Sequence, residues 1–295
     1  MMTMRQLRYF QALSETLHFG NAARQLNISQ PALSTQIAQM ESYLGTELFS
    51  RAASGVTLTA DGNFIAGRVR RILADVADLE SLADRGASIL SGRLRVGMIA
   101  TVAPYLLPKL LPIAAQQFPD LDCEIRESVT DRLVADLHDG DIDCAIVALP
   151  IDDARIATVP LVEDVFSLAI PMSEIGRFRS PVPPQLLASE RMILLEEGHC
   201  MRSQALEICA VTDRHNRARL GATSLTTILR MVAGGLGTTL IPSIAIDDET
   251  RAGGIAILPI AAPVPSRHLV LAFRPTTIRA ADISAFAELI RQVLQ

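Results

Sequence analysis

The sequence predicts a multidomain α+β protein with a small helical domain, a long linker helix and a two-lobed α/β domain. Its 295 residues exceed the ~100–200 residues of one ordinary domain. The chain is 49% hydrophobic and 20% charged, a composition that suits a folded core and excludes a disordered protein. Apolar residues recur at helical spacing in the first third, whereas strand-like and helix-like segments alternate in the rest.

Three domains with defined boundaries are expected. Residues 1–59 form the helical domain, residues 60–91 the linker helix and residues 92–295 the α/β domain. Within the last, lobe I takes residues 92–163 and 268–295, and lobe II takes residues 164–267. No apolar run reaches the ~18–20 residues of a membrane helix, and the N-terminus lacks the pattern of a secretory signal. We therefore expect a cytoplasmic protein that does not enter membranes.

The charge is distributed unevenly along the chain. The net charge of −5 gives no general attraction to nucleic acid. Residues 1–95, however, contain ten Arg against eight acidic residues, a net of +2, so residues 96–295 carry −7. Any binding of nucleic acid is therefore expected in the first third.

The first 45 residues predict three short helices. The first spans residues 4–17, because its apolar residues share one helical face: Leu7, Phe10, Leu13 and Leu17. The second spans residues 20–26 and ends in a tight turn. Ser29 is placed as the N-cap of the third helix, with Pro31 in its first turn.

The third helix has an uncharged, hydrogen-bonding outer face. Its inward residues are Leu33, Ile37 and Met40, and its outward residues are Gln30, Ser34, Thr35, Gln36 and Gln39. Such a face on the second helix of a tight pair is what a helix-turn-helix needs to contact base edges in the major groove. An ordinary amphipathic helical hairpin has the same periodicity, so the pattern alone leaves both interpretations open.

A wing and a long helix are expected next. Leu48–Arg51 and Val56–Leu58 are typical of a two-stranded wing. Thr59 can cap the helix that follows, whose apolar residues alternate in steps of four and three: Ile65, Val69, Ile72, Val76, Leu79 and Ala83. This is a heptad seam, and we expect it to join two copies of the chain, although it could also pack on its own chain.

The rest of the chain alternates between strands and helices. The expected strands are residues 94–98, 142–149, 192–195, 239–241 and 269–273, and the expected helices are residues 103–117, 131–139, 201–209, 225–233 and 283–294. This alternation predicts parallel α/β units. We interpret it as two similar lobes with a ligand site in the cleft between them.

The following residues lie in register with a known family: Phe19-Gly20-Asn21-Ala22-Ala23, Leu26 to Ser34, Ile37, Glu41, Leu44-Gly45, Leu48-Phe49, Arg51 and Leu58-Thr59. Their pattern resembles the LysR-type transcriptional regulators. That family has a winged helix-turn-helix, a linker helix and a two-lobed, periplasmic-binding-protein-like effector domain. Gly234-Gly235-Leu236-Gly237, before a strand that ends at Pro242, is similar to its second lobe.

The resemblance implies roles for particular residues. Gln30, Pro31, Ser34 and Thr35 would face double-stranded operator DNA, and Arg51 would anchor the wing. It also implies a homo-oligomer, a dimer through the linker helix and then a tetramer. Relatives often carry basic residues where this chain has Ser54 and Gly55, which weakens the expected contact with the DNA backbone. Neither enzymatic activity nor a cofactor or metal ion is expected.

Residues 194–209, 222–225 and 100–108 are closely similar to the peroxide-sensing members of this family, the OxyR group. The resemblance implies that hydrogen peroxide is the signal, that Cys200 is the peroxidatic thiol and that Cys209 resolves it. A thiol reductant of the glutaredoxin or thioredoxin type would reverse the reaction.

Four residues are expected to line the peroxide pocket by the same similarity: Thr101, Thr130, His199 and Arg267. Hydroxyls can hold a peroxide oxygen, and a guanidinium can stabilise a thiolate or a leaving group. The structural alternatives are a helix cap or turn for each threonine, a loop residue for His199 and a solvated surface charge for Arg267.

A helix from Cys200 to Cys209 and a disulfide between these two residues exclude each other. Nine helical residues separate two Cα atoms by about 13 Å, whereas a disulfide needs them within about 7 Å. Oxidation must therefore unwind the segment. A bridge that closes so short a loop contributes ~2–3 kcal/mol, and re-exposing the apolar side chains of the helix costs a similar amount. We predict a strained bridge whose potential lies above the roughly −300 mV of structural disulfides.

The other two cysteines are expected to be structural. Cys123 and Cys144 lie in strand-like runs and are predicted to be buried packing residues.

Two other functions stay open. The first is a LysR-type regulator that binds a small-molecule inducer in the inter-lobe cleft, without a thiol switch. A thiol peroxidase is the third hypothesis, although no cysteine follows a Pro-x-x-x-Thr/Ser-x-x-Cys pattern.

Overall fold

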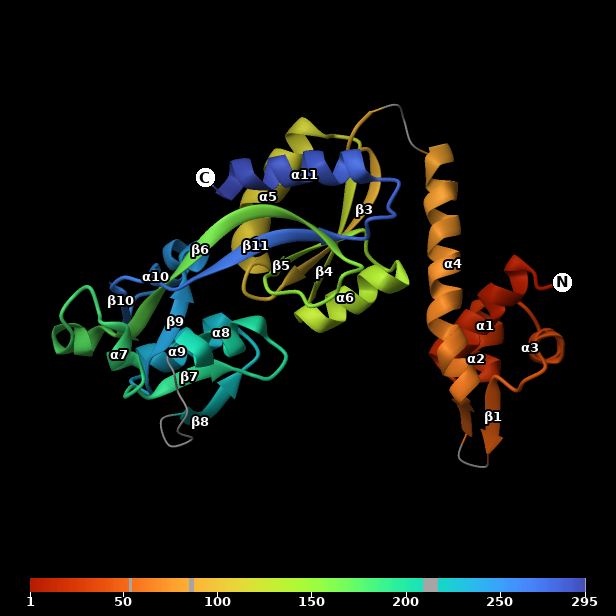
Figure 1. Ribbon diagram of the computed structural model, residues 1–295, viewed down its shortest axis with the longest axis horizontal. Coiled ribbons are helices and arrows are strands. Elements are labelled where there is room, and N and C mark those ends of the chain that lie inside the picture. Colours follow the sequence, from red (N-terminus) through yellow and green to blue (C-terminus); the bar gives the residue numbers. More distant parts are fainter. Residues whose placement is uncertain (53–54, 85–87, 209–216, 295) are drawn as a thin grey trace. The chain divides into compact units, whose positions relative to one another are not determined.

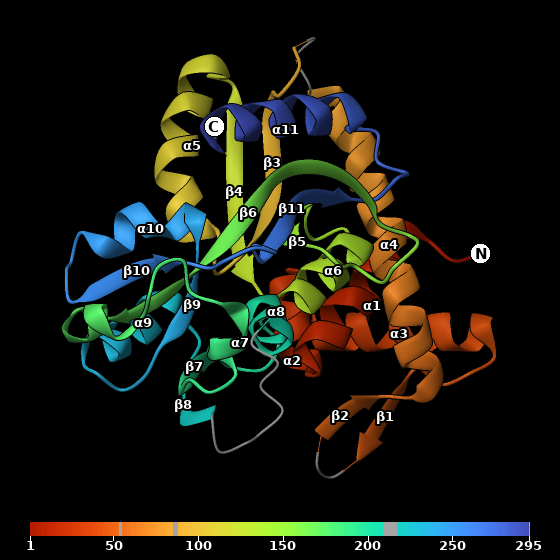
Figure 2. The same ribbon diagram turned by 60° about the vertical axis from the view of Figure 1, so that its left-hand side comes forward.

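The structure is a computed structural model that describes residues 1–52, 55–84, 88–208 and 217–294. Its ribbon is drawn from two directions in Figures 1 and 2. The chain divides into two compact units, residues 1–84 with 138–141 and residues 85–137 with 142–295. We call them the N-terminal unit and the C-terminal unit.

The N-terminal unit contains the predicted helices and wing. Its elements are α1 (Met4–Thr16), α2 (Phe19–Gln25), α3 (Gln30–Leu44), β1 (Phe49–Ala52), β2 (Gly55–Leu58) and α4 (Ala60–Asp84). β1 and β2 pair antiparallel, with Phe49 opposite Leu58. The predicted winged helix-turn-helix followed by a long helix is therefore confirmed.

Side-chain caps fix where two of these helices begin. The Ser29 hydroxyl accepts a hydrogen bond from the Ala32 N–H at 3.3 Å, and Pro31 lies in the first turn of α3. The Thr59 hydroxyl accepts one from the Gly62 N–H at 2.9 Å, at the start of α4. Each such cap contributes about 0.5–2 kcal/mol. The inward residues of α3 are buried as predicted, together with residues of α1: Phe10, Leu13, Leu33, Ile37 and Met40.

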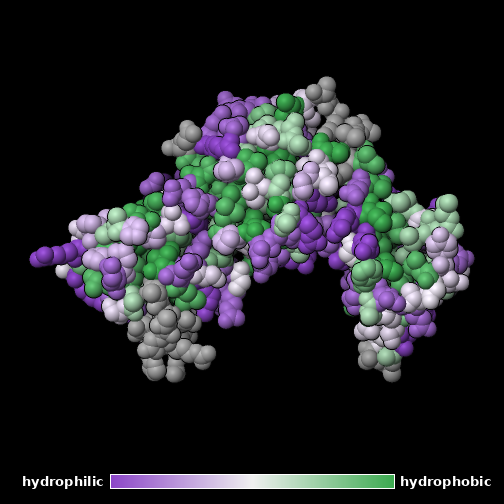
Figure 3. All heavy atoms as spheres, viewed as in Figure 1, coloured by the Kyte–Doolittle hydropathy of each residue, from purple (hydrophilic) through white to green (hydrophobic). Residues whose placement is uncertain are grey.

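The heptad seam of α4 is used in two ways. Ile65 and Val69 pack into the core of the N-terminal unit, where Val69 is 2% exposed. Ile72 and Leu79 remain 41% and 61% exposed, and Figure 3 shows hydrophobic residues at the surface along α4. The first part of the seam thus packs on its own chain, and only the later part is free to meet another helix.

A seven-stranded mixed sheet organises the C-terminal unit. Its strands are β3 (Gly92–Ile99), β4 (Leu121–Ser128), β5 (Cys144–Ala148), β6 (Ala157–Pro171), β9 (Thr239–Pro242), β10 (Ile255–Pro259) and β11 (Ser266–Phe273). The order is β10-β6-β11-β5-β3-β4, and β9 also pairs with β6. A separate pair joins β7 (Met192–Leu195) to β8 (Arg217–Ala222).

The prediction of parallel units is only partly right. β3 pairs parallel with β4 and β5, and β7 pairs parallel with β8. β6 and β11, in contrast, pair antiparallel with each other, and both pair antiparallel with their other neighbours. The 15-residue β6 was not predicted as a strand. It first pairs with β11 and then with β9 and β10, so one strand continues between two halves of the unit.

Helices cover both faces of the sheet and create two apolar cores. They are α5 (Ala103–Gln117), α6 (Thr130–Asp139), α7 (Pro184–Leu187), α8 (Cys200–Ile208), α9 (Leu225–Ala233), α10 (Ser243–Thr250) and α11 (Ala280–Leu294), with a 3-10 turn at Met172–Arg177. α5 and α11 lie on one face of the sheet and α6 on the other (Figures 1 and 2). One core gathers residues of β3, β5, β11, α5 and α11, and the other gathers residues of β6, β7, β9, α9 and β10. None of the described helices combines the length and apolar character needed to span a membrane.

Candidate DNA interface and thiol site

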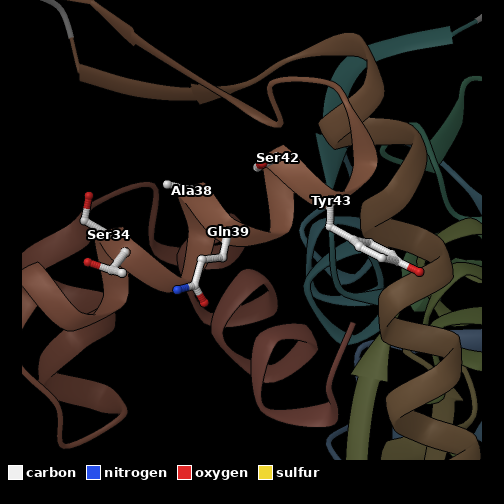
Figure 4. A pocket seen from close by; sticks show the side chains of 6 residues that line it. Ser34, Ala38, Gln39, Ser42 and Tyr43 are labelled. Carbon is white, nitrogen blue, oxygen red and sulfur yellow. The ribbon is translucent and has the colours of Figure 1, made fainter. Parts of the chain in front are cut away.

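The exposed face of α3 is polar and largely uncharged. Gln30, Pro31 and Thr35 are exposed, and Ser34 is half-buried. Figure 4 shows the side chains that line a shallow hollow of about 630 Å³ on this helix: Ser34, Thr35, Ala38, Gln39, Ser42 and Tyr43. Hydroxyl, amide and phenol groups of this kind can donate to and accept from base edges, so the hydrogen-bonding face extends beyond the residues chosen from the sequence.

Arg51 ties the wing to the helix-turn-helix. Its guanidinium carbon lies 4.3 Å from the centre of the Phe19 ring, and its Nη2 donates to the Ser34 hydroxyl at 3.3 Å. A cation over an aromatic ring gains about 0.5–1 kcal/mol at an exposed site. Phe19 thus holds the Arg51 side chain in place, a contact that was not predicted from the sequence, although Phe19 begins the segment that resembles the family.

Cys200 is a free thiol at the first residue of α8. It is half-buried and packs against the core that contains β3 and β5. Gly198 turns the chain before it with a φ of +93°, a conformation that favours glycine. The His199 carbonyl accepts from the Arg202 N–H at 2.9 Å within the first turn. Cys209, its expected partner, lies outside the described residues.

The segment that carries Cys200 lies beside the start of α6 and the end of β5. A Cβ built on Gly198 would lie 3.6 Å from the Val129 side chain, next to Thr130. One turn into α8, the Gln204 amide donates to the Leu149 carbonyl at the end of β5, at 3.3 Å. The segment that carries Cys200 therefore begins near Val129 and is hydrogen-bonded through Gln204 to the end of β5.

Thr130 carries a buried hydroxyl that does not act as a helix cap. It is the first residue of α6, and the backbone bond that begins this helix runs from Leu133 N–H to the Val129 carbonyl. Within the described part of the chain its hydroxyl oxygen is buried and has no hydrogen-bond partner, as is also true of the Gln204 Oε1. Buried polar atoms without partners are rare and point to a missing ligand or water.

Thr101 and Arg267 are brought together directly. Both are 2% exposed, and the Arg267 Nη1 donates to the Thr101 hydroxyl at 2.7 Å. The alternative that Arg267 is a solvated surface charge is therefore wrong. Thr101 precedes α5 and accepts this bond instead of capping the helix. Among the described residues, no hydrogen bond joins Cys200 or His199 to this pair.

Asp164 is the site residue that sequence reasoning missed. Its carboxylate lies 2.8 Å from Arg267 Nη2 and also accepts from Arg267 Nε at 2.9 Å. A buried guanidinium is tolerated only with such a partner. The sequence gives no local signal for it, because 103 residues separate the two and their pairing depends on the register of β6 with β11.

Cys144 is a buried packing residue, as predicted, whereas Cys123 packs against the same core but is only half-buried. Cys144 is fully buried in β5, and burial raises the pKa of its thiol well above the ordinary value. Burial also raises the pKa of the half-buried Cys123 thiol. Both are thus poor nucleophiles near neutral pH, because the thiolate is the reactive form. No group of three or more metal-binding side chains was found in the ranges that the structure describes.

Two protein families match the chain. The family described as "LysR substrate binding domain" matches residues 87–295, and the "Bacterial regulatory helix-turn-helix protein, lysR family" matches residues 4–63. The "DNA-binding transcriptional dual regulator OxyR" of Escherichia coli K12 is 37% identical over 290 residues, which cover 98% of this chain and 95% of that protein. A "Probable hydrogen peroxide-inducible genes activator" of Mycobacterium leprae is 35% identical over 99% of this chain and 94% of its own.

Solved structures share the fold over nearly the whole chain. A cysteine variant of full-length OxyR from Pseudomonas aeruginosa is 35% identical, with a TM-score of 0.81, over 99% of this chain and 95% of that chain. A hydrogen-peroxide-bound OxyR variant from Corynebacterium glutamicum is 33% identical, with a TM-score of 0.67, over 99% of this chain and 94% of that chain.

Proposed function

Because the chain belongs to the LysR family of bacterial transcription regulators, we propose that it senses hydrogen peroxide through Cys200 and Cys209 and alters its contacts with operator DNA when they form a disulfide. The observation that carries the proposal is the position of the free, half-buried Cys200 at the first residue of the intact helix α8. DNA binding itself follows from the helix-turn-helix family; the thiol switch is the proposal.

An intact α8 excludes the disulfide. The Cα atoms of Cys200 and Ile208, the ends of the helix, are about 12 Å apart at ~1.5 Å of rise per residue. One more residue adds at most ~3.8 Å, so the residue directly after Ile208 cannot place its Cα closer than about 8 Å to that of Cys200. A disulfide needs about 7 Å or less. Forming the bridge must therefore open α8, the helix whose Gln204 side chain donates to the Leu149 carbonyl.

The chemistry begins with the Cys200 thiolate. The N–H groups of the first turn of α8 favour a negative charge at its start. The sulfur attacks one peroxide oxygen, so that an S–O bond forms as the O–O bond breaks, and the departing hydroxide takes up a proton to become water. The thiol of Cys209 then attacks the sulfenic sulfur and displaces a second water.

Four side chains would hold the peroxide in this proposal: Thr101, Thr130, His199 and Arg267. Its support is the buried, unpartnered hydroxyl of Thr130 and the hydroxyl of Thr101 aligned by Arg267. Peroxide oxygens can both accept and donate hydrogen bonds, which suits two hydroxyls.

On the DNA side, Gln30, Pro31, Ser34 and Thr35 would meet base edges, and Arg51 would meet the backbone beside them. The exposed Ile72 and Leu79 of α4 would join two copies, so that two recognition helices meet the halves of one operator. A cellular dithiol reductant of the glutaredoxin or thioredoxin class would return the pair to thiols.

Peroxide treatment of the purified full-length protein tests the proposal. A slight excess of hydrogen peroxide should yield a Cys200–Cys209 bridge by mass spectrometry and a changed operator footprint. Cys200→Ser and Cys209→Ser should abolish the bridge and the footprint change. Cys123→Ser is the matched control, because it removes an equally half-buried thiol that has a raised pKa. A peroxide response of the purified protein that survives in both serine variants would reject the switch. Serine variants that still respond in cells would favour a small-molecule inducer in the inter-lobe cleft.

A further inference from the structure

One buried carboxylate holds groups from two separate elements. Asp164, 2% exposed, receives Arg267 of β11 on its Oδ2, through Nε at 2.9 Å and Nη2 at 2.8 Å. Its Oδ1 accepts from the Ser243 hydroxyl at 2.7 Å and from the Ile244 N–H at 3.2 Å, at the start of α10. Because its Nε and Nη2 atoms are both held by this carboxylate, the Arg267 guanidinium has a fixed orientation.

The two terminal nitrogens of the Arg267 guanidinium contact Thr101. Arg267 Nη1 donates to the Thr101 hydroxyl oxygen at 2.7 Å, and Nη2 donates to the Thr101 carbonyl at 3.2 Å. A guanidinium can only donate, so the Thr101 oxygen is the acceptor and its own proton must point elsewhere. Within the described ranges, no hydrogen bond uses that proton. The Thr101 hydroxyl therefore keeps its proton available to donate to a further acceptor.

We propose that Asp164 is a positioning residue for the reaction with peroxide: through Arg267 it makes Thr101 a hydrogen-bond donor to the oxygen that leaves. The inference rests on the proposed function, in which Thr101 lines the peroxide site. When the Cys200 sulfur bonds to one oxygen and the O–O bond breaks, negative charge develops on the other oxygen, which ends as water after taking up a proton. A donor already aimed at that oxygen needs no reorganisation during the reaction.

A direct role of the Arg267 charge is the competing account. The guanidinium is already paired with Asp164 and lies 5.7 Å from the Phe166 ring centre. In that account, removing Asp164 would leave an unpaired cation and speed every reaction of the Cys200 thiolate. In ours, removing Asp164 slows only the reaction that needs a donor.

Two reagents separate these accounts. The rate of loss of the Cys200 thiol is measured on the reduced full-length protein with hydrogen peroxide and, separately, with iodoacetamide, whose iodide leaving group needs no proton donor. Asp164→Asn should lower the peroxide rate at least tenfold and leave the iodoacetamide rate within twofold. For scale, removing one hydrogen-bond donor to a developing oxyanion slows catalysis by enzymes about 10²–10³-fold. Asp164→Glu, which restores the carboxylate, should recover most of the peroxide rate.

Tyr105→Phe is the matched control. The Tyr105 hydroxyl is buried and donates to Glu249 Oε1 at 2.8 Å, so this variant also loses a buried hydrogen bond to a carboxylate, but one in which Arg267 takes no part. Both of its rates should equal those of the original chain. If Asp164→Asn fails to fold, Arg267→Lys is tested in its place. A single ammonium group can pair with Asp164 but lacks the second set of donors with which the guanidinium contacts Thr101. It should show the same selective loss.

The outcomes are distinguishable. Equal losses in both rates in a folded variant, or an unchanged peroxide rate, would overturn the role of Asp164 while leaving the switch intact. An increase in both rates would instead establish a direct role of the Arg267 charge. If the original chain fails to react with peroxide at Cys200 at all, the proposed function fails, and this inference fails with it.

Discussion

At the scale of residues, surroundings decide which thiol reacts. Burial raises the pKa of the Cys144 and Cys123 thiols, so at a given pH each is less often the reactive thiolate than an exposed cysteine. In native protein at pH 8, iodoacetamide should leave Cys144 unmodified. Labelling of Cys123 should become appreciable only when the pH exceeds about 9, the ordinary pKa of a cysteine thiol, because its own pKa is raised. Peptide mass spectrometry measures this, with denatured protein as the control in which every cysteine labels. Native labelling of Cys144 as fast as that of Cys200 would contradict the burial argument.

At the scale of elements, the stability of α8 sets the potential of the proposed disulfide, because the reduced state contains this helix. Ser203 is exposed in α8 and allows a matched pair of variants. Gly is about 1 kcal/mol less favourable than Ala inside a helix, which converts to about 20 mV. Ser203→Gly should therefore have a potential about 20 mV more negative than Ser203→Ala, measured by equilibration with glutathione buffers. Equal potentials would mean that α8 does not open on oxidation.

At the scale of the whole molecule, the exposed end of the α4 seam is expected to hold two copies together. Leu79 is 61% exposed and lies one heptad after Ile72. Leu79→Glu would place a charge in that contact and should weaken self-association at least tenfold by sedimentation velocity. Arg71→Glu, also at an exposed position of α4, changes charge outside the seam and should leave the association constant nearly unchanged. Dissociation by both variants equally would indicate electrostatic rather than apolar association.

Much of the fold could be predicted from patterns of residues that are close together in the sequence. The Ser29 cap, the inward residues of α3 and helices α5 and α9 were predicted from periodicity and capping, because these depend on neighbours a few residues apart. The 15-residue β6 and its antiparallel partners were not predicted. A strand that serves two cores alternates between different surroundings along its length, so it lacks one clean period.

By itself, the sequence determined the helix-turn-helix, the long linker helix and the two cysteines at positions 200 and 209, whose residues carry the family resemblance. Only the tertiary structure decided that Arg267 is buried, that Asp164 is its partner and that Thr101 receives its hydrogen bond. The physical reason is separation along the chain. These three residues meet through the register of β6 with β11 and the turn before α5, and long-range pairing of this kind leaves no periodic trace in the residues on either side.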